Sequence, residues 1–487
     1  MNRGKAQSII SNFLWRFAER CGAQGVSFIV SIVLARMLEP SVYGIIAIVS
    51  VFLNILSVFI EGGFGNALIQ KKDADDLDFS SVFYFNLLFC VILYVVMFII
   101  APFIAEFYKM PELTSVLRVM CIILILSGLR NIQGAYISKH LIFKKFFFST
   151  MIGTVLAAIV GIVMAKKGFG VWALVTQWLV NCVLDTIILW ITVKWRPKKM
   201  FSLTRLKSLF SFGWKILLSH IIDVCYNNIR SLIIGKIYTP SSLAFYNKGK
   251  TFPELIITNI NSSIDSVLLP TMAQEQDKID NVRNMTRRSI KTSTYIIMPM
   301  MMGLAVCAEP IVTILLTEKW LPSVFFMRIF CFSYAFWPVH TANLNAINAL
   351  GRSDLYLKLE IIKKTVGIIA IVSTMWISVE AMAYSMFVTS ILSQIINSFP
   401  NKKLLKYSYL SQLKDMLPQI SLSVFMGAIV YCVQFLNFNS VITLIIQVPL
   451  GALIYILGSK LFHIDSFEYL LNIVKNFLKK KNPSVAA

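Results

Sequence analysis

The chain has 487 residues, of which 57% are hydrophobic and 14% are charged, and its mean hydropathy is +0.72. Soluble globular proteins have roughly 45–50% apolar residues, so the composition excludes a water-soluble protein and indicates an integral membrane protein. The net charge of +22 would favour nucleic-acid binding in a soluble chain, but the basic residues lie in loops between apolar segments, where membrane topology explains them, so we expect no nucleic-acid partner.

About 14 apolar segments follow one another, each long enough to cross a hydrocarbon core that takes roughly 20 helical residues. The predicted spans are 11–35, 43–69, 80–104, 114–138, 147–165, 170–193, 209–235, 251–273, 292–316, 323–349, 361–377, 380–399, 417–436 and 441–462. Charged residues interrupt the first segment and no cleavage motif follows it, which predicts a retained helix rather than a signal peptide. Lys and Arg gather in the alternate loops that include both termini, so we expect cytoplasmic termini.

A weak internal repeat relates spans one to six to spans seven to twelve. Arg36-Met-Leu-Glu-Pro40-Ser41 matches Lys236-Ile-Tyr-Thr-Pro240-Ser241 at an offset of 200 residues, directly after spans one and seven. Each half holds an even number of spans, so both halves enter the membrane in the same orientation. The repeat predicts two lobes related by an axis along the membrane normal.

We therefore expect an all-α integral membrane protein with two pseudo-symmetric six-helix lobes and two additional C-terminal helices. The expected parts are an N-lobe at 1–207, a C-lobe at 208–402, the last two spans at 403–463 and a basic amphipathic cytoplasmic tail at 464–487. The tail has two open interpretations, a helix on the anionic inner leaflet and a solvated segment.

Polar and charged side chains concentrate in the first two spans of each half. A charge at mid-membrane costs about 2.5–3.5 kcal/mol on insertion scales, so such residues normally face a cavity or a partner. They are Arg16, Glu19, Arg20 and Gln24 in span one, Glu61 in span two, Lys215, His220, Asp223, Asn227 and Arg230 in span seven, and Asn261 and Asp265 in span eight. Their spacing of three, four, seven or eight residues within a span favours a shared helix face. We predict a polar central cavity between the lobes.

The charge balance of spans one and seven predicts an anionic ligand. Each span has two basic residues against one acidic residue: Arg16 and Arg20 against Glu19, and Lys215 and Arg230 against Asp223. The alternative that remains open is that these groups form neutral pairs that only hold helices together. Arg130 in span four is either a further cavity cation or structural. Arg118 is expected to snorkel to the interface, and Asp185 to have a hydrogen-bonded structural role.

Signals for enzymatic or metal chemistry are missing from the sequence. The eight cysteines lie in apolar segments without a C-x-x-C motif or a histidine at ligand spacing. No P-loop, G-x-S-x-G or H-E-x-x-H motif is present, and the outer loops are too short for the catalytic domain of a glycan ligase or polymerase. We expect a transporter that is not an enzyme and that needs no metal or cofactor.

Several motifs between residues 12 and 247 carry a resemblance to a known family, and the resemblance covers essentially the whole chain. They are Asn12–Trp15, Leu34–Gly44, Glu61–Gln70, Phe169–Leu174 and Pro240–Asn247. With them the chain resembles the polysaccharide transporters of the multidrug, oligosaccharidyl-lipid and polysaccharide exporter (MOP) superfamily, particularly the Wzx-type lipopolysaccharide and exopolysaccharide flippases. The peptidoglycan lipid-precursor flippases and the small-molecule exporters of the same superfamily, known as MATE transporters, are the alternatives.

The resemblance implies alternating access and a cargo of undecaprenyl-diphosphate-linked oligosaccharide for surface polysaccharide synthesis at the bacterial inner membrane. Arg16, Arg20, Lys215, Arg230 and Arg130 are then expected to bind the diphosphate. We expect transport to be driven by the membrane potential or by H⁺ or Na⁺ coupled through an acidic residue. Expected partners are membrane lipids and the polysaccharide polymerase and chain-length machinery, with the transporter itself a monomer.

Overall fold

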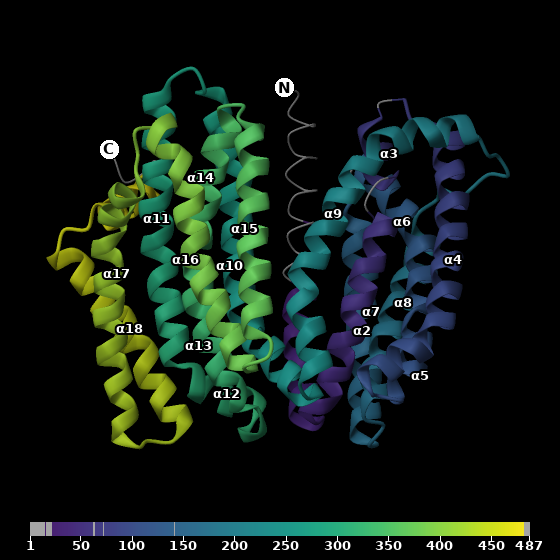
Figure 1. The fold of residues 1–487 in the computed structure, drawn as a ribbon, viewed down its shortest axis with the longest axis horizontal. Helices are drawn as coiled ribbons and strands as arrows, with labels where there is room; N and C mark the ends of the chain where they lie inside the picture. The colour runs from purple at the N-terminus through teal and green to yellow at the C-terminus, as the bar shows by residue number, and fades with distance from the viewer. Residues whose placement is uncertain (1–14, 16–21, 62–63, 72, 141, 482–487) are drawn as a thin grey trace. The chain divides into compact units, whose positions relative to one another are not determined.

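The structure is a computed structural model that describes residue 15 and residues 22–61, 64–71, 73–140 and 142–481. Within these ranges the regular secondary structure is helical and no residue lies in a β-strand. By its internal contacts the chain divides into two compact units, Met1–Ala244 and Phe245–Ala487. In each unit the long helices pack side by side, as expected where every backbone N–H and C=O must be paired within the membrane (Figure 1).

The first unit begins with an apolar helix at Gly22–Met37. The labelled helices that follow are α2 (Pro40–Glu61), α3 (Phe64–Gln70), α4 (Asp76–Tyr108), α5 (Glu112–Met120), α6 (Ile122–His140), α7 (Lys144–Lys166), α8 (Val171–Thr192) and α9 (Leu203–Ile237). The chain passes into the second unit within α10 (Pro240–Gln274).

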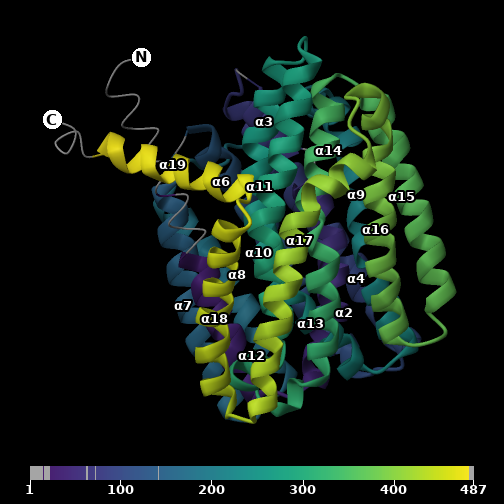
Figure 2. The same ribbon diagram turned by 90° about the vertical axis from the view of Figure 1, so that its left-hand side faces the viewer.

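The second unit contains the remainder of α10 and all later helices. These are α11 (Ile279–Val306), α12 (Ala308–Leu316), η1 (Glu318–Trp320), α13 (Pro322–Ala335), α14 (Trp337–Ala349), α15 (Ser353–Thr374), α16 (Val379–Leu404), α17 (Tyr409–Cys432), η2 (Val433–Leu436), α18 (Ser440–Leu461) and α19 (Asp465–Lys481). Figure 2 shows that α19 lies across the end of α18 instead of continuing its direction.

The contact boundary lies later than the lobe boundary predicted at 207/208. The difference is α9, which the repeat assigns to the second half but which packs on α2, α3 and α4 of the first unit. The predicted lobe boundaries therefore stay predictions based on the repeat.

Nine helical segments of the described ranges are long and apolar enough to cross a membrane, or ten when α11 and α12 count as one span bent by 65°. Gly22–Met37, α9, α10 and α15 are helices at four further predicted spans that do not meet this criterion. The described part of the first span is short, and the other three carry the polar residues that lower hydropathy. The count of fourteen spans stays a prediction.

One span predicted as continuous is sharply bent in the structure: 292–316 lies in α11 and α12, which meet at 65°. The spans 114–138 and 323–349 are each divided into two consecutive helices, α5 with α6 and α13 with α14. In the span 43–69, α2 ends at Glu61 and α3 begins at Phe64, on either side of residues outside the described ranges. Hydropathy does not register a kink, because a bent helix is as apolar as a straight one.

The repeat is reproduced in the local structure at the predicted register. One helix ends at Met37 and the next begins at Pro40, and 200 residues later α9 ends at Ile237 and α10 begins at Pro240. Proline suits the first turn of a helix because the N–H that it lacks would have no helical partner there. The two halves therefore use the same residue type to start their second helix.

A buried acidic group fixes the segment that leads into α9. Asp78 is fully buried and accepts from Lys71 Nζ at 2.6 Å, and it pairs with Arg205 Nη1 at 3.3 Å. The backbone N–H of Ser202 donates to Ser81 Oγ at 2.9 Å, next to the start of α9. These contacts tie α9 to the beginning of α4, which fixes where the polar residues of α9 lie along the unit.

In the second unit, buried amides hold α14 against two neighbouring helices. Asn343 on α14 and Gln412 on α17 exchange two side-chain hydrogen bonds of 2.9 Å, and Asn401 Nδ2 on α16 donates to Asn343 Oδ1 at 2.7 Å. All three residues are 0% exposed. The network fixes the position of α14, which in turn contacts α10.

Gly44 is required by a close helix crossing in the first unit. A Cβ at this position would lie 1.9 Å from the carbonyl oxygen of Pro240, so no side chain fits without backbone movement. We predict that Gly44→Ala lowers stability by about 2 kcal/mol or more, although alanine favours helix by about 1 kcal/mol. The measurement is the thermal unfolding of purified protein in detergent.

Gly303→Ala is the matched control, because a Cβ there meets no atom within 4 Å. This variant is expected to keep or slightly raise the unfolding temperature. Equal unfolding temperatures of the two variants would contradict the close crossing at Gly44.

Candidate functional site

The structure describes part of the predicted site. Arg16, Glu19 and Arg20 lie outside the described residues. Glu61 ends α2 and Lys215 lies within α9, and for these two the structure describes only the backbone. Most of the predicted site residues whose side chains the structure describes lie on α9 in the first unit and on the part of α10 in the second unit.

One face of α9 presents exposed polar side chains. His220, Asp223 and Asn227 are exposed and Arg230 is partly exposed. At 100° per residue these four positions fall within one narrow sector of the helix. Asp223 and Arg230 also take part in interactions within the protein, so neither is a free charge. Gln24, on the helix Gly22–Met37, is exposed as well.

The opposite face of α9 is also exposed, but it is apolar. Trp214, Leu218 and Ile222 are 43%, 49% and 50% exposed and follow one another at four-residue steps. A helix within a membrane can expose apolar side chains to lipid, whereas exposed charged side chains need water or a partner. The two faces of α9 therefore fit two different surroundings, lipid on one side and water on the other.

α10 carries a row of hydroxyl and amide side chains that we call the hydroxyl stripe. Its members are the exposed residues Thr258, Asn259, Ser262, Ser263 and Ser266. Four of them donate to carbonyl oxygens of their own helix at 2.7–3.1 Å: Thr258, Ser262, Ser263 and Ser266. A hydroxyl that donates inward keeps lone pairs that can accept from outside. The hydroxyl stripe is thus a set of hydrogen-bond acceptors.

The two polar residues of α10 predicted for the site lie beside the hydroxyl stripe and contact α14. Thr341 Oγ1 donates to Asn261 Oδ1 at 2.8 Å, and Asn345 Nδ2 donates to Asp265 Oδ1 at 2.8 Å. Because these bonds hold one side of α10, the adjoining stripe has a fixed orientation within the second unit. The stripe was not predicted from the sequence, although the four-residue spacing of Thr258, Ser262 and Ser266 is a visible signal.

Arg130 forms an ion pair inside the first unit. Its Nη1 lies 2.5 Å from Asp185 Oδ2, which joins α6 to α8, and the two side chains are 35% and 10% exposed. The second carboxylate oxygen of Asp185 is buried without a hydrogen-bond partner, so Arg130 is the group that compensates this charge. Its charge is therefore partly neutralised before any ligand binds, and Arg130 is a weaker candidate for diphosphate binding than the sequence suggests.

Other potential site chemistry is sparse in the part of the chain that the structure describes. No group of three or more His, Cys, Asp or Glu side chains there is arranged to hold a metal ion. Arg118 packs its guanidinium 4.2 Å from the ring centroid of Phe98 and donates to the Phe98 carbonyl. Phe98 belongs to the same unit as Arg118.

Comparison with known proteins identifies relatives over most of the chain. A family model described as polysaccharide biosynthesis protein matches residues 33–325. The chain is 24% identical over 315 residues to the succinoglycan biosynthesis transport protein ExoT of Rhizobium meliloti, covering 65% of this chain and 64% of that protein. It is 24% identical over 316 residues to the teichuronic acid biosynthesis protein TuaB of Bacillus subtilis, covering 61% and 62%. The match thus spans less than two thirds of either relative.

A third relative and two solved structures extend the comparison. The lipopolysaccharide biosynthesis protein WzxC of Escherichia coli is 22% identical over 75% of each chain. The lipid II flippase MurJ in an inward closed conformation matches with a TM-score of 0.73 and 14% identity, covering 94% of this chain and 99% of that chain. An inward-facing multidrug resistance MATE family transporter of the MOP superfamily matches with a TM-score of 0.61 and 15% identity, covering 79% and 94%.

The structural matches confirm the fold class expected from the sequence. The chain is a multi-pass, all-α membrane protein with the fold of the MOP superfamily.

The pairing of Arg130 with Asp185 gives a stability prediction. We expect Arg130→Met to lower stability by on the order of 2 kcal/mol, less than for a fully buried pair because Arg130 is 35% exposed. The double variant Arg130→Met, Asp185→Leu should recover most of this loss, since no uncompensated carboxylate remains. Thermal unfolding of the single and double variants measures the coupling, and purely additive losses would contradict the pair.

Proposed function

Because the chain belongs to the polysaccharide biosynthesis protein family, we propose that it is a flippase for a lipid-linked oligosaccharide. It carries the glycan headgroup from the cytoplasmic to the outer leaflet by alternating access and so serves the synthesis of a surface polysaccharide. The relatives named as a succinoglycan transport protein and as a lipopolysaccharide biosynthesis protein support this cargo class.

The observation that carries the proposal is the presence of exposed polar faces on α9 and α10. A sugar hydroxyl taken into hydrocarbon without a partner costs several kcal/mol, so a headgroup of several sugars needs a hydrated, polar path. The acceptor oxygens of the hydroxyl stripe suit sugar hydroxyls, which donate hydrogen bonds. Leu218 and Ile222, exposed on the other side of α9, suit contact with the lipid chain that stays in the bilayer.

The diphosphate of the carrier lipid is the proposed ligand of the cationic residues. Arg16, Arg20, Lys215 and Arg230 are the residues that we assign to it, and guanidinium groups can bind phosphate oxygens in bidentate fashion. Arg130 is left out because Asp185 already neutralises part of its charge. Glu19, Gln24, Glu61, His220, Asn227 and Asn261 are assigned to the polar lining of the path.

Outward movement of this headgroup can draw on the membrane potential. A headgroup with two net negative charges gains roughly 4.6 kcal/mol per 100 mV when it moves out of a negative interior. Coupling of H⁺ or Na⁺ through Glu61, Asp223 or Asp265 is the alternative source of energy. Flipping measured in vesicles with an imposed potential and no ion gradient separates the two.

We place the protein in the bacterial cytoplasmic membrane as a monomer with both termini in the cytoplasm. The concentration of Lys and Arg in alternate loops supports this orientation. The polysaccharide polymerase and chain-length machinery, which use the flipped glycan, are the proposed protein partners.

A peptidoglycan lipid-precursor flippase is the second candidate, because MurJ shares the fold over 94% of this chain. Rescue of cells depleted of their peptidoglycan precursor flippase would favour this candidate. The proposal requires that the chain rescue a mutant that lacks a surface-polysaccharide flippase. It also requires that the chain not rescue the cells depleted of their peptidoglycan precursor flippase.

The assigned cations give the first functional prediction. Arg20→Ala, Lys215→Ala and Arg230→Ala should each reduce export at least about tenfold, since a hydrogen bond to a charged group contributes about 1.5–3 kcal/mol. The measurement is surface polysaccharide in a flippase-deleted strain, with protein level monitored in parallel. Arg118→Ala is the matched control, because its guanidinium packs on Phe98 of its own unit, and it should retain export. Full activity of all three site variants would remove the diphosphate assignment.

The hydroxyl stripe gives a second functional prediction. The combined change of Thr258, Ser262 and Ser266 to Ala should lower export severalfold at unchanged protein level, because three acceptors for sugar hydroxyls are lost. Thr365→Ala is the control, since this threonine also donates to its own helix but lies between the exposed Ile361 and Ile369 on an apolar face of α15. Equal export by the triple variant and the control would exclude a role for the stripe.

A further inference from the structure

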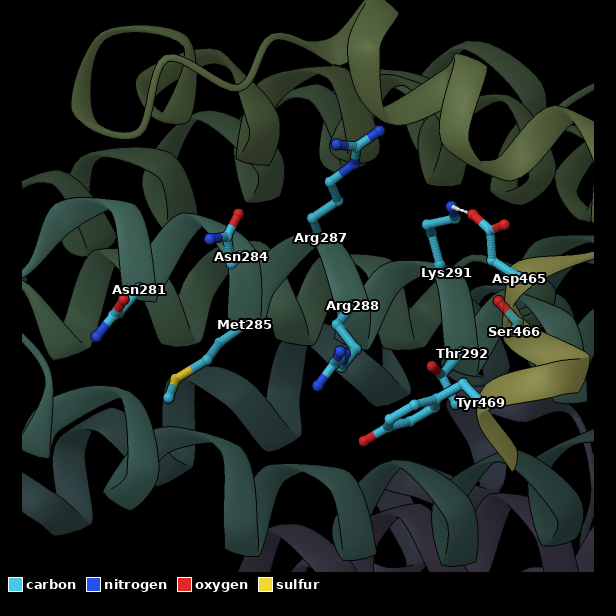
Figure 3. A pocket seen from close by; sticks show the side chains of 10 residues that line it. All are labelled: Asn281, Asn284, Met285, Arg287, Arg288, Lys291, Thr292, Asp465, Ser466 and Tyr469. Carbon is cyan, nitrogen blue, oxygen red and sulfur yellow. Dashed lines mark hydrogen bonds and ion pairs between the residues drawn. The ribbon is translucent and has the colours of Figure 1, made fainter. Parts of the chain in front are cut away.

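A cavity of about 570 Å³ lies between α11 and α19 in the second unit. Arg287, Arg288 and Lys291 line it from α11, and Asp465, Ser466 and Tyr469 line it from the start of α19. Figure 3 shows the three basic side chains along one helix, with the α19 residues at one end of the row. None of these residues belongs to the polar faces of α9 and α10.

The basic side chains of this cavity are held in place by specific partners. Arg287 donates to both carboxylate oxygens of Asp415 through Nε at 2.7 Å and Nη2 at 2.6 Å. Lys291 Nζ lies 2.5 Å from Asp465 Oδ2, the pair joined by the dashed line in Figure 3. Three cations thus stand against two carboxylates, which leaves one net positive charge.

Arg288 carries the surplus charge. Its guanidinium lies 4.4 Å from the ring centroid of Tyr469, and no carboxylate of the described ranges forms an ion pair with it. Stacking on a ring orients a guanidinium without consuming its N–H donors, which remain available to an oxyanion. Lys291 lies close by on the same helix, and its partner Asp465 has a side chain that is 78% exposed, so water screens this pair more than the pair of Arg130 with Asp185, and Lys291 can contribute a second cation.

The position of the cavity favours a membrane lipid headgroup as the anion. α19 crosses the end of α18 instead of extending it (Figure 2), the direction of a helix that lies at a membrane surface. Phe467 and Leu470 of α19 pack against the buried cluster that includes Tyr295 and Tyr455, while Leu471 is 38% exposed. Lysines follow at the end of α19, the usual signal for the anionic inner leaflet.

We propose that this cavity binds the phosphate headgroup of an anionic glycerophospholipid of the inner leaflet, with Arg288 and Lys291 as its cationic ligands. The lipid fixes α19 across the end of the bundle. The site is separate from the proposed path of the glycan, so it does not depend on the transport function.

Lipid retention by the purified full-length protein tests the proposal. Phosphatidylglycerol and phosphatidylcholine are titrated into the protein in detergent, and bound lipid is counted by native mass spectrometry. We expect a tightly held phosphatidylglycerol and no equivalent phosphatidylcholine. Arg288→Gln should weaken phosphatidylglycerol binding about fivefold, and Arg288→Gln with Lys291→Gln about 25-fold, the ratios expected for about 1 kcal/mol per basic residue.

The control is Lys358→Gln with Lys402→Gln, which removes the same charge from exposed positions outside the cavity. It should bind phosphatidylglycerol like the unmodified protein, and equal weakening of control and cavity variants would overturn the proposal.

A second arm of the experiment adds millimolar inorganic phosphate. Phosphate that displaces the lipid or gives the same thermal stabilisation would overturn the lipid assignment in favour of a site for free phosphate. Thermal unfolding of every variant verifies the fold, and Arg288→Gln alone decides the outcome should the double variant fail to fold.

Discussion

The cost of placing polar groups against lipid is the constraint on which the whole interpretation depends. α9 exposes His220, Asp223 and Asn227 on one face and Leu218 and Ile222 on the other. Within a bilayer these two faces cannot share one environment, because a charged side chain is stable there only beside water or a partner. The same argument applies to the hydroxyl stripe of α10. Faces of this kind need water or polar partners inside the bilayer region, and the proposed transport of a polar headgroup gives such water a function.

The two polar faces offer different kinds of interaction, and the difference suits a transporter. Charged contacts of about 1.5–3 kcal/mol each supply most of the affinity, whereas neutral hydrogen bonds to hydroxyls contribute about 0.5–1.5 kcal/mol each and exchange readily with water. A phosphate common to all lipid-linked glycans can thus be held by cations. Under the proposed function, the variable sugars would meet interchangeable acceptors, which would lower the cost of moving them along the path.

Much of the fold could be predicted from the sequence, because hydropathy and the repeat can both be recognised without knowing which residues contact one another. The helix boundary at Met37 and Pro40 recurs at Ile237 and Pro240, as the repeat predicts. The pairing of Arg130 with Asp185 could not be predicted, since the two residues are 55 positions apart in sequence and meet only when α6 packs on α8. The hydroxyl stripe was missed for another reason: serine and threonine have near-neutral hydropathy and draw no attention inside an apolar segment.

The prolines of α10 indicate how its polar segment can change orientation during the proposed transport. Proline lacks the N–H that would bond to the residue four positions earlier, so Pro253 leaves the carbonyl of Gly249 without its helical partner. Gly249 itself is closely packed, because a Cβ there would lie 2.6 Å from Phe326 of α13. The hydroxyl stripe begins after Pro253 and ends before Pro270, which weakens the helix again. The stripe therefore lies on a segment with a weakened hydrogen bond at each end, while the residues before it are fixed against α13. Bending at Pro253 can move the stripe while Gly249 stays packed against α13, provided that the hydrogen bonds of Asn261 and Asp265 to α14 open. The proposed alternating access requires such a movement of a helix that lines the path.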